Sequence, residues 1–137
     1  ILAGGIRPHY YCLPVIKREQ HRLALVAAAT SGNPKFFLGT DSAPHPTSLK
    51  ETACGCAGCY SAHSALELYT EVFERAGSLD KLEGFASYYG ADFYRLPRNA
   101  GTVTLEKTTW RIPSFYGENG NTITPLKADE ELSWKMQ

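Results

Sequence analysis

The strongest hydrophobic pattern along the chain predicts an amphipathic helix over 61–76. Apolar residues recur there every three or four positions, so that one face of a helix stays continuously apolar. The apolar positions are Ala62, Ala65, Leu66, Tyr69, Val72, Phe73 and Ala76. Gly77 ends this stretch, and Ser78 is placed to cap a second helix, which we predict over 78–87.

Helical spacing near the start of the chain predicts another helix over 18–29, which a turn at 31–34 terminates. Next comes the apolar run Phe36–Leu38, bounded by Pro34 and Gly39, which is typical of a short buried strand. A helix, a glycine turn, a strand and then a loop follow one another as expected of an α/β protein.

The remaining stretches carry little periodicity. We expect residues 41–60 to form a long functional loop, because a structureless stretch of that length in a compact domain is usually functional or mobile. An extended segment is expected at 10–13 and a short helical turn at 90–94. Residues 97–137 are predicted to form an irregular tail with a β-prone piece at 103–112.

Length and charge narrow the possible functions. The 137 residues suffice for one domain, whereas a complete (β/α)₈ barrel needs roughly 250 residues. Because 14 basic residues balance 14 acidic ones, we expect neither a nucleic-acid partner nor a membrane surface. The longest apolar runs are too short to span a bilayer, and we expect no signal peptide. Since the chain begins at Ile1 rather than Met, we expect a processed chain or part of a longer polypeptide.

Asp41 is the first candidate for chemistry, because it follows the predicted strand. The carboxyl ends of strands are where α/β sheets and barrels carry their active sites. A carboxylate there can bind a metal or act as a general base, and the alternative is a turn or helix-capping aspartate. His45 lies on the same loop between Pro44 and Pro46. Its imidazole can hold a substrate carboxylate or bind a metal, unless it is simply an exposed loop histidine.

The other histidines are weaker candidates. His21 lies in a predicted helix and His63 at a predicted helix start. His9, beside Pro8 in the opening loop, is placed so that it can face the same site as Asp41. Arg7 can attract an anionic ligand there, although such residues are more often surface charges.

Four cysteines suggest a competing interpretation. Cys12, Cys54, Cys56 and Cys59 could together hold a structural zinc ion or an iron–sulfur cluster. Their spacing is not the paired C-x₂-C of a zinc ribbon, and the missing secretory signal argues against disulfides. We favour a tight glycine-rich loop in which small residues let the backbone approach a ligand closely.

Three motifs together resemble the C-terminal part of one known family. They are Gly5-Ile6-Arg7-Pro8-His9-Tyr10-Tyr11-Cys12-Leu13-Pro14, Phe37-Leu38-Gly39-Thr40-Asp41-Ser42-Ala43-Pro44-His45 and Gly55-Cys56-Ala57-Gly58-Cys59, with Leu132-Ser133-Trp134 near the end. The chain thereby resembles the homodimeric-type dihydroorotases, which are metal-dependent barrels of the amidohydrolase superfamily. The implied fold is α/β, as the C-terminal part of a (β/α)₈ TIM-type barrel with a C-terminal tail.

The resemblance implies the zinc-dependent, reversible cyclisation of N-carbamoyl-L-aspartate to L-dihydroorotate in de novo pyrimidine biosynthesis. Asp41 matches the family's catalytic aspartate, which binds one ion of a binuclear zinc centre and moves the proton. His45 matches a residue that contacts the substrate carboxylate, and Leu13 and Ala57 match positions whose backbone groups contact the substrate. The resemblance further implies a cytoplasmic homodimer.

Several family residues have no counterpart in this chain. The H-x-H pair, the carboxylated bridging lysine and two further metal-binding histidines are missing, so most zinc ligands are expected upstream of Ile1. One carboxylate cannot build a two-metal site, and we therefore expect the isolated chain to be inactive and poorly folded. Two alternatives stay open, a cysteine-based structural metal-binding module and a non-catalytic remnant of the barrel.

Overall fold

The structure, a computed structural model, describes residues 7–15, 18–53, 55–118 and 120–137. The backbone forms two compact units, each assembled from three stretches that are separated in sequence. The first unit takes described residues of 1–16, 40–65 and 111–131, and the second takes those of 17–39, 66–110 and 132–137. The predicted site residues Leu13, Asp41, His45 and Ala57 all belong to the first unit.

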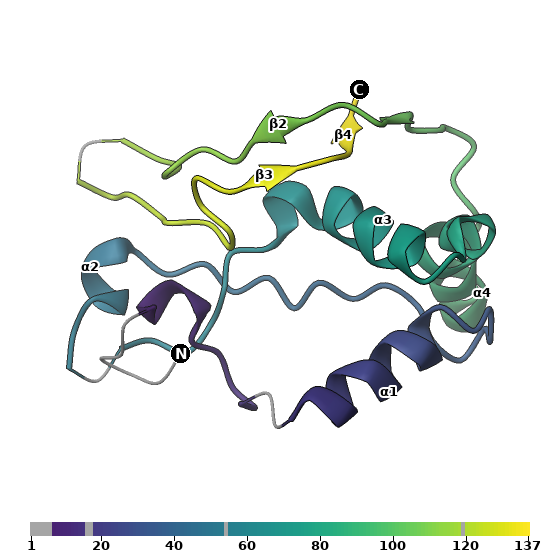
Figure 1. The fold of residues 1–137 in the computed structure, drawn as a ribbon, viewed down its shortest axis with the longest axis horizontal. Helices are drawn as coiled ribbons and strands as arrows, with labels where there is room; N and C mark the ends of the chain where they lie inside the picture. The colour runs from purple at the N-terminus through teal and green to yellow at the C-terminus, as the bar shows by residue number, and fades with distance from the viewer. Residues whose placement is uncertain (1–6, 16–17, 54, 119) are drawn as a thin grey trace. The chain divides into compact units, whose positions relative to one another are not determined.

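Helices account for most of the regular structure (Figure 1). The longer helices are α1 (Glu19–Ala29), α3 (Ala65–Arg75) and α4 (Tyr89–Tyr94). The shorter ones are α2 (Thr47–Lys50), the 3₁₀ turns η1 (Pro8–Tyr10), η2 (Ala62–Ser64) and η3 (Leu79–Lys81), and the π-helical turn η4 (Gly84–Tyr88). No helix formed by the described residues is long and apolar enough to cross a membrane.

Four strands of two residues each lie in the last third of the chain. They are β1 (Leu105–Glu106), β2 (Trp110–Arg111), β3 (Glu131–Leu132) and β4 (Lys135–Met136). β1 pairs with β4 in antiparallel register, with Leu105 opposite Met136, and β2 lies beside β3. The described part of the chain is therefore a mixture of helices and very short strands.

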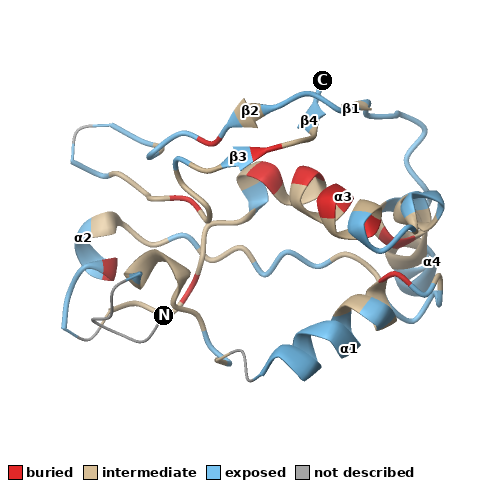
Figure 2. Ribbon diagram, viewed as in Figure 1, coloured by how far each residue is buried: buried red, intermediate tan, exposed pale blue. Residues whose placement is uncertain are grey.

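The apolar core of the second unit is built on helix α3. Phe73 is fully buried, and its ring centroid lies 5.2 Å from that of Phe85, which in turn lies 5.1 Å from that of Tyr69. Figure 2 shows buried positions along successive turns of α3. The amphipathic pattern read from the sequence thus places its apolar stripe in a core, as the spacing requires.

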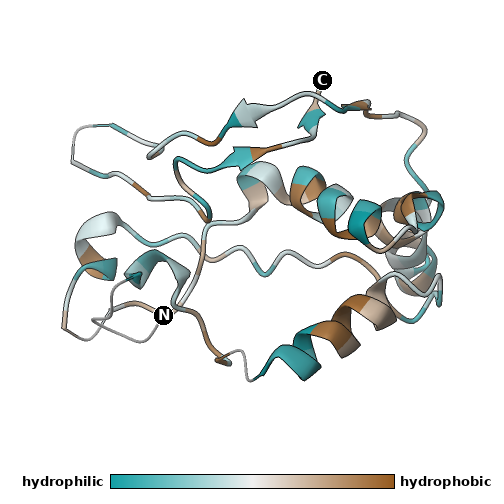
Figure 3. Cartoon of the chain, viewed as in Figure 1, coloured by the Kyte–Doolittle hydropathy of each residue, from teal (hydrophilic) through white to brown (hydrophobic). Residues whose placement is uncertain are grey.

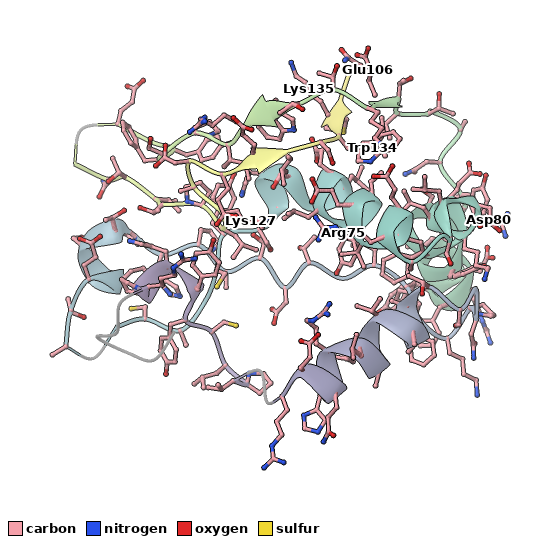
Figure 4. The ribbon with its side chains drawn as sticks, in the orientation of Figure 1. Arg75, Asp80, Glu106, Lys127, Trp134 and Lys135 are labelled. Carbon is pink, nitrogen blue, oxygen red and sulfur yellow. The ribbon has the colours of Figure 1, made fainter. Side chains whose placement is uncertain are left out.

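Three glutamates of α3 hold the end of the chain in the same unit. Glu71 is 7% exposed, and its Oε1 accepts hydrogen bonds from the Ser133 backbone N (2.8 Å) and Oγ (2.9 Å). Glu67 accepts a hydrogen bond from the Met136 backbone N, and Glu74 accepts one from the indole nitrogen of Trp134. Figure 4 labels Trp134 and its neighbour Lys135 on this terminal segment. Because buried carboxylates need such donors, these bonds fix the terminal strand on the helix.

Helix α1 exposes much of its apolar surface. Leu23 is 54% exposed and Leu25 69%, and α1 contains no buried residue. Figure 3 shows hydrophobic positions along α1, which Figure 2 colours as exposed or intermediate. Leu25 and Phe36 also line an apolar groove of about 490 Å³ within the second unit. An apolar surface of this kind is typical of an element that another part of a protein covers.

The helices predicted from periodicity are largely confirmed. The predicted helix at 18–29 is α1, and η2 and α3 together occupy the stretch predicted as 61–76. The predicted helix over 78–87 is confirmed, because residues 79–94 are helical without interruption and include the predicted turn at 90–94. The helix type changes along this stretch, from the 3₁₀ turn η3 to the π-helical turn η4 and then α4. Gly84 begins the π-helical turn, and a Cβ there would come within 2.6 Å of the Tyr89 ring.

The predicted buried strand at Phe36–Leu38 is wrong for this structure. No described residue from 30 to 46 lies in a strand, and Phe36 is exposed. The amide of Leu38 instead donates a hydrogen bond to the carbonyl of Phe85. A strand requires a neighbour that supplies a ladder of hydrogen bonds. The other amide bond of this stretch among the described residues, from Phe36 to the carbonyl of Asn33, closes a local turn and pairs no strand.

The stretch 41–60 is less irregular than predicted. It contains the helical turn α2, which places Lys50 in a buried position. The segment predicted as extended at 10–13 begins inside η1 and is irregular beyond it. In the tail, strands form at both ends of the β-prone piece 103–112.

We predict that Glu71→Ala loosens the terminal segment, because it leaves the Ser133 amide without its buried acceptor. A loss of about 2 kcal/mol of local stability corresponds to roughly 30-fold faster amide exchange. Hydrogen–deuterium exchange of peptides covering 131–137 measures this effect. Glu19→Ala, which removes only an exposed partner of Arg22, is the matched control and should leave those peptides unchanged. Unchanged exchange in Glu71→Ala would contradict the role given to this carboxylate.

Candidate functional site

Two loop segments of the first unit meet at the predicted substrate positions. His45 Nε2 lies 3.1 Å from the carbonyl oxygen of Ala57, and the amide of Ala43 donates to the carbonyl of Cys59 at 2.9 Å. The segment that carries His45 therefore runs against the glycine-rich segment 55–59. Two of the four predicted site residues, His45 and Ala57, are brought into direct contact.

Gly58 makes this close approach possible. A Cβ at this position would lie 2.5 Å from the carbonyl oxygen of Ala43 and 3.0 Å from Cδ2 of His45. Its φ of +144° is also a conformation that side-chain-bearing residues rarely adopt. Gly58 thus permits a close approach between two parts of the chain, whereas the predicted approach to a ligand stays a prediction.

Lys50 is a buried lysine at this site, and it was not among the candidates predicted from the sequence. The residue is 3% exposed. Its Nζ donates hydrogen bonds to the backbone carbonyls of Tyr11 (2.8 Å), Cys56 (2.6 Å) and Gly58 (2.7 Å). The amide of Gly58 also donates to the Tyr11 carbonyl at 3.0 Å. All three donors of the ammonium group are therefore satisfied by backbone oxygens.

Asp41 is exposed. Its φ of +43° lies in the left-handed region, which aspartate tolerates better than most residues. The next residue fixes its backbone, because Ser42 Oγ accepts hydrogen bonds from the amides of Ser61 and Ala62, both at 3.1 Å. An unusual backbone conformation held by such contacts is often found at functional sites.

Leu13 is 60% exposed and follows Tyr11 by two residues. Because the Tyr11 carbonyl is bound by both Lys50 and Gly58, the backbone that leads to Leu13 is fixed on the glycine-rich segment. Among the described residues, no hydrogen bond or ion pair joins Leu13 or Asp41 to His45. These two predicted site residues are thus anchored through their neighbours.

His9 has a partner outside the site of Asp41. His9 Nε2 lies 3.0 Å from Glu51 Oε1, in a cavity of about 450 Å³ that Arg7 and Tyr10 also line. This pairing gives no support to the expectation that His9 faces the site of Asp41. Burial, followed by a hydrogen bond to Glu130, raises the pKa of Tyr10 in this cavity to about 12.

The cysteines do not form a metal centre in the described part of the chain. Cys54 lies outside the described residues, and Cys12, Cys56 and Cys59 are free thiols. Among the residues that the structure describes, no group of three or more His, Cys, Asp or Glu side chains could hold a metal ion. Burial, and then the neighbouring Cys12, raises the pKa of Cys59 to about 11, while Lys50 opposes this rise.

A zinc ion would find one suitable ligand here. The exposed carboxylate of Asp41 offers the oxygen donors that zinc accepts. A binuclear centre requires several further ligands, which would come from outside the described residues.

Comparison with known proteins identifies relatives of the whole chain. No protein-family model matches it. The chain is 67% identical over 134 residues to a dihydroorotase of Methylobacillus flagellatus and 65% identical over 136 residues to one of Acaryochloris marina. These alignments cover 98% and 99% of this chain but 39% of each relative. The chain thus spans about 39% of the length of these curated relatives.

Solved structures of dihydroorotases are also similar to nearly the whole of this chain. The dihydroorotase of Saccharomyces cerevisiae in complex with 5-fluoroorotic acid matches with a TM-score of 0.89 and 35% identity, over 97% of this chain and 38% of that one. The dihydroorotase of Campylobacter jejuni matches with a TM-score of 0.83 and 34% identity, over 95% and 38%. The chain is therefore homologous to cyclic amide hydrolases. Among these, it corresponds to a C-terminal portion of a dihydroorotase.

We predict that Gly58→Ala disrupts the contact between the two loops, because its Cβ would overlap the carbonyl oxygen of Ala43. The substitution should lower the free energy of unfolding by about 3 kcal/mol, a value typical of overpacked sites. Faster amide exchange in peptides covering 55–61 would reveal it. Gly101→Ala, where a Cβ would meet nothing within 4 Å, is the matched control and should behave like the unsubstituted chain. Equal exchange in both variants would be inconsistent with a close approach at Gly58.

A second prediction concerns the pH dependence of Cys59. Because its pKa is raised to about 11, the reactive thiolate is a minor species at pH 8 and becomes abundant only as the pH approaches 11. Iodoacetamide should therefore label Cys59 roughly 100-fold more slowly at pH 8 in the folded protein than in denaturant. Mass spectrometry of the labelled peptides measures both rates. Rapid labelling of the folded protein at pH 8 would argue against the raised pKa.

Proposed function

We propose that this chain supplies part of the active site of a dihydroorotase, which interconverts N-carbamoyl-L-aspartate and L-dihydroorotate in pyrimidine biosynthesis. The observation that carries the proposal is the contact between the segment after Asp41 and the glycine-rich segment, made by His45 and Ala57 at 3.1 Å. Homology to dihydroorotases over nearly the whole chain supports it.

In this proposal, three residues bind the substrate. The imidazole of His45 contacts the substrate carboxylate, an interaction that a charged or hydrogen-bonding ring provides well. The backbone groups of Leu13 and Ala57 contact the polar edge of the ring. Exposed backbone held in place by other parts of the chain suits this task, because it loses little freedom when the substrate binds.

Asp41 is the catalytic acid and base in this proposal. Its carboxylate takes the proton of the attacking water when the ring opens and returns a proton to the ring nitrogen. The same carboxylate would serve as a zinc ligand. Bound zinc would supply a Lewis acid that polarises the amide carbonyl and an activated water at neutral pH.

The proposal also assigns a surrounding structure. We infer that the chain completes a (β/α)₈ barrel, since its exposed apolar positions on α1 and at Phe36 need cover. A cytoplasmic homodimer is part of the same proposal, and the isolated chain should show no turnover.

A chimaera tests the proposal. The 137 residues replace the matching segment of the Methylobacillus flagellatus dihydroorotase, to which they are 67% identical. The chimaera should hydrolyse L-dihydroorotate, and Asp41→Asn should lower kcat by at least about 10³-fold because it removes the general base. Asp80→Asn, at an exposed position in η3, is the matched control and should keep full activity.

Two results would refute the proposed role. An inactive, folded chimaera would indicate a non-catalytic remnant. An active chimaera that keeps its turnover after Asp41→Asn would place the acid and base elsewhere.

A further inference from the structure

We propose that Lys50 is a positioning residue, which orients the substrate-binding backbone of Ala57 and of the segment leading to Leu13. The proposal rests on the proposed function of these two positions. It concerns a residue that touches only the chain itself and acts through the groups that it holds.

Three backbone carbonyls surround the ammonium group of Lys50, and we call this arrangement the Lys50 cage. The buried Nζ donates to three backbone oxygens at distances between 2.6 and 2.8 Å. Tyr11 lies far from Lys50 in the sequence, whereas Cys56 and Gly58 lie on the nearby glycine-rich segment. No ion pair links it to a described carboxylate. The cage therefore fixes backbone conformation, because each carbonyl has to point at a single shared atom.

Two of these carbonyls flank the proposed substrate contact. Cys56 and Gly58 precede and follow Ala57, and both of their carbonyl oxygens bind Lys50. The intervening carbonyl of Ala57 meets His45 Nε2 instead. Lys50 thus holds the Cys56–Ala57 and Gly58–Cys59 peptide groups. The Ala57–Gly58 peptide group between them is bound by His45 at its carbonyl and by Tyr11 at its amide.

The third carbonyl belongs to the opposite substrate segment. Tyr11 binds Lys50 through its oxygen and lies two residues before Leu13. One ammonium group therefore holds both backbone segments that the proposed function places against the substrate, and it sets their separation.

The turn α2 directs Lys50 into this cage. Its first residues follow Pro46, whose carbonyl accepts hydrogen bonds from the amides of Leu49 and Lys50. The carbonyl of Leu49 also accepts a hydrogen bond from the amide of Cys56. Replacing the ammonium group by an apolar one would leave buried carbonyls without donors, so that the loops would shift or admit water.

Lys50→Met in the chimaera tests the proposal, because it keeps the length of the side chain and removes its donors. The KM for L-dihydroorotate should rise at least about tenfold, while kcat stays within about threefold, as for lost ground-state binding. Zinc content should equal that of the unsubstituted chimaera. Lys135→Met, an exposed lysine in β4 labelled in Figure 4, is the matched control and should change neither constant.

The outcomes separate this inference from the proposed function. An unchanged KM in active Lys50→Met overturns the positioning role, even if yield or kcat falls, because a merely structural role lowers only the amount of active enzyme. If Lys50→Met gives no folded protein, the KM of Lys50→Gln decides instead. This variant retains an N–H donor, and an unchanged KM in it likewise overturns the positioning role. Failure of the proposed function would appear differently, as an inactive unsubstituted chimaera.

Discussion

The candidate site depends on one buried ammonium group. Lys50 binds the carbonyls of Tyr11, Cys56 and Gly58 and thereby joins loops that have little regular structure of their own. Loops need such contacts, because each ordered residue loses conformational entropy that local hydrogen bonds must offset. The close approach at Gly58 and the contact of His45 with Ala57 both lie within the arrangement that Lys50 holds.

Both units rely on buried polar groups as much as on apolar packing. In the second unit, Glu71 of α3 binds the terminal segment at Ser133, while Phe73 and Phe85 form a small core. Helix α1 meanwhile keeps its leucines exposed. A structure with small cores and exposed apolar helices gains stability when further protein covers those faces. This agrees with a chain that matches about 39% of the length of its relatives.

The sequence predicted those features whose cause is local. The helices α1 and α3 follow from apolar periodicity. The glycine-rich segment allows a close approach of the chain to itself at Gly58, which its composition made possible. The prediction of a strand at Phe36–Leu38 was wrong, because the pairing of a strand depends on neighbouring strands rather than on apolar character alone. Lys50 was missed for a related reason. A lysine in a loop is usually exposed, and only the three-dimensional meeting of distant carbonyls makes this one a buried anchor.

In the proposed enzyme, His45 and the segment 55–59 form one wall of the active site. A crystal structure of the chimaera with L-dihydroorotate would show whether they do. We expect the substrate carboxylate at the His45 ring, with the backbone of Ala57 and Leu13 within hydrogen-bonding distance of the ligand. A ligand bound away from these residues in an active crystal would rule out this arrangement.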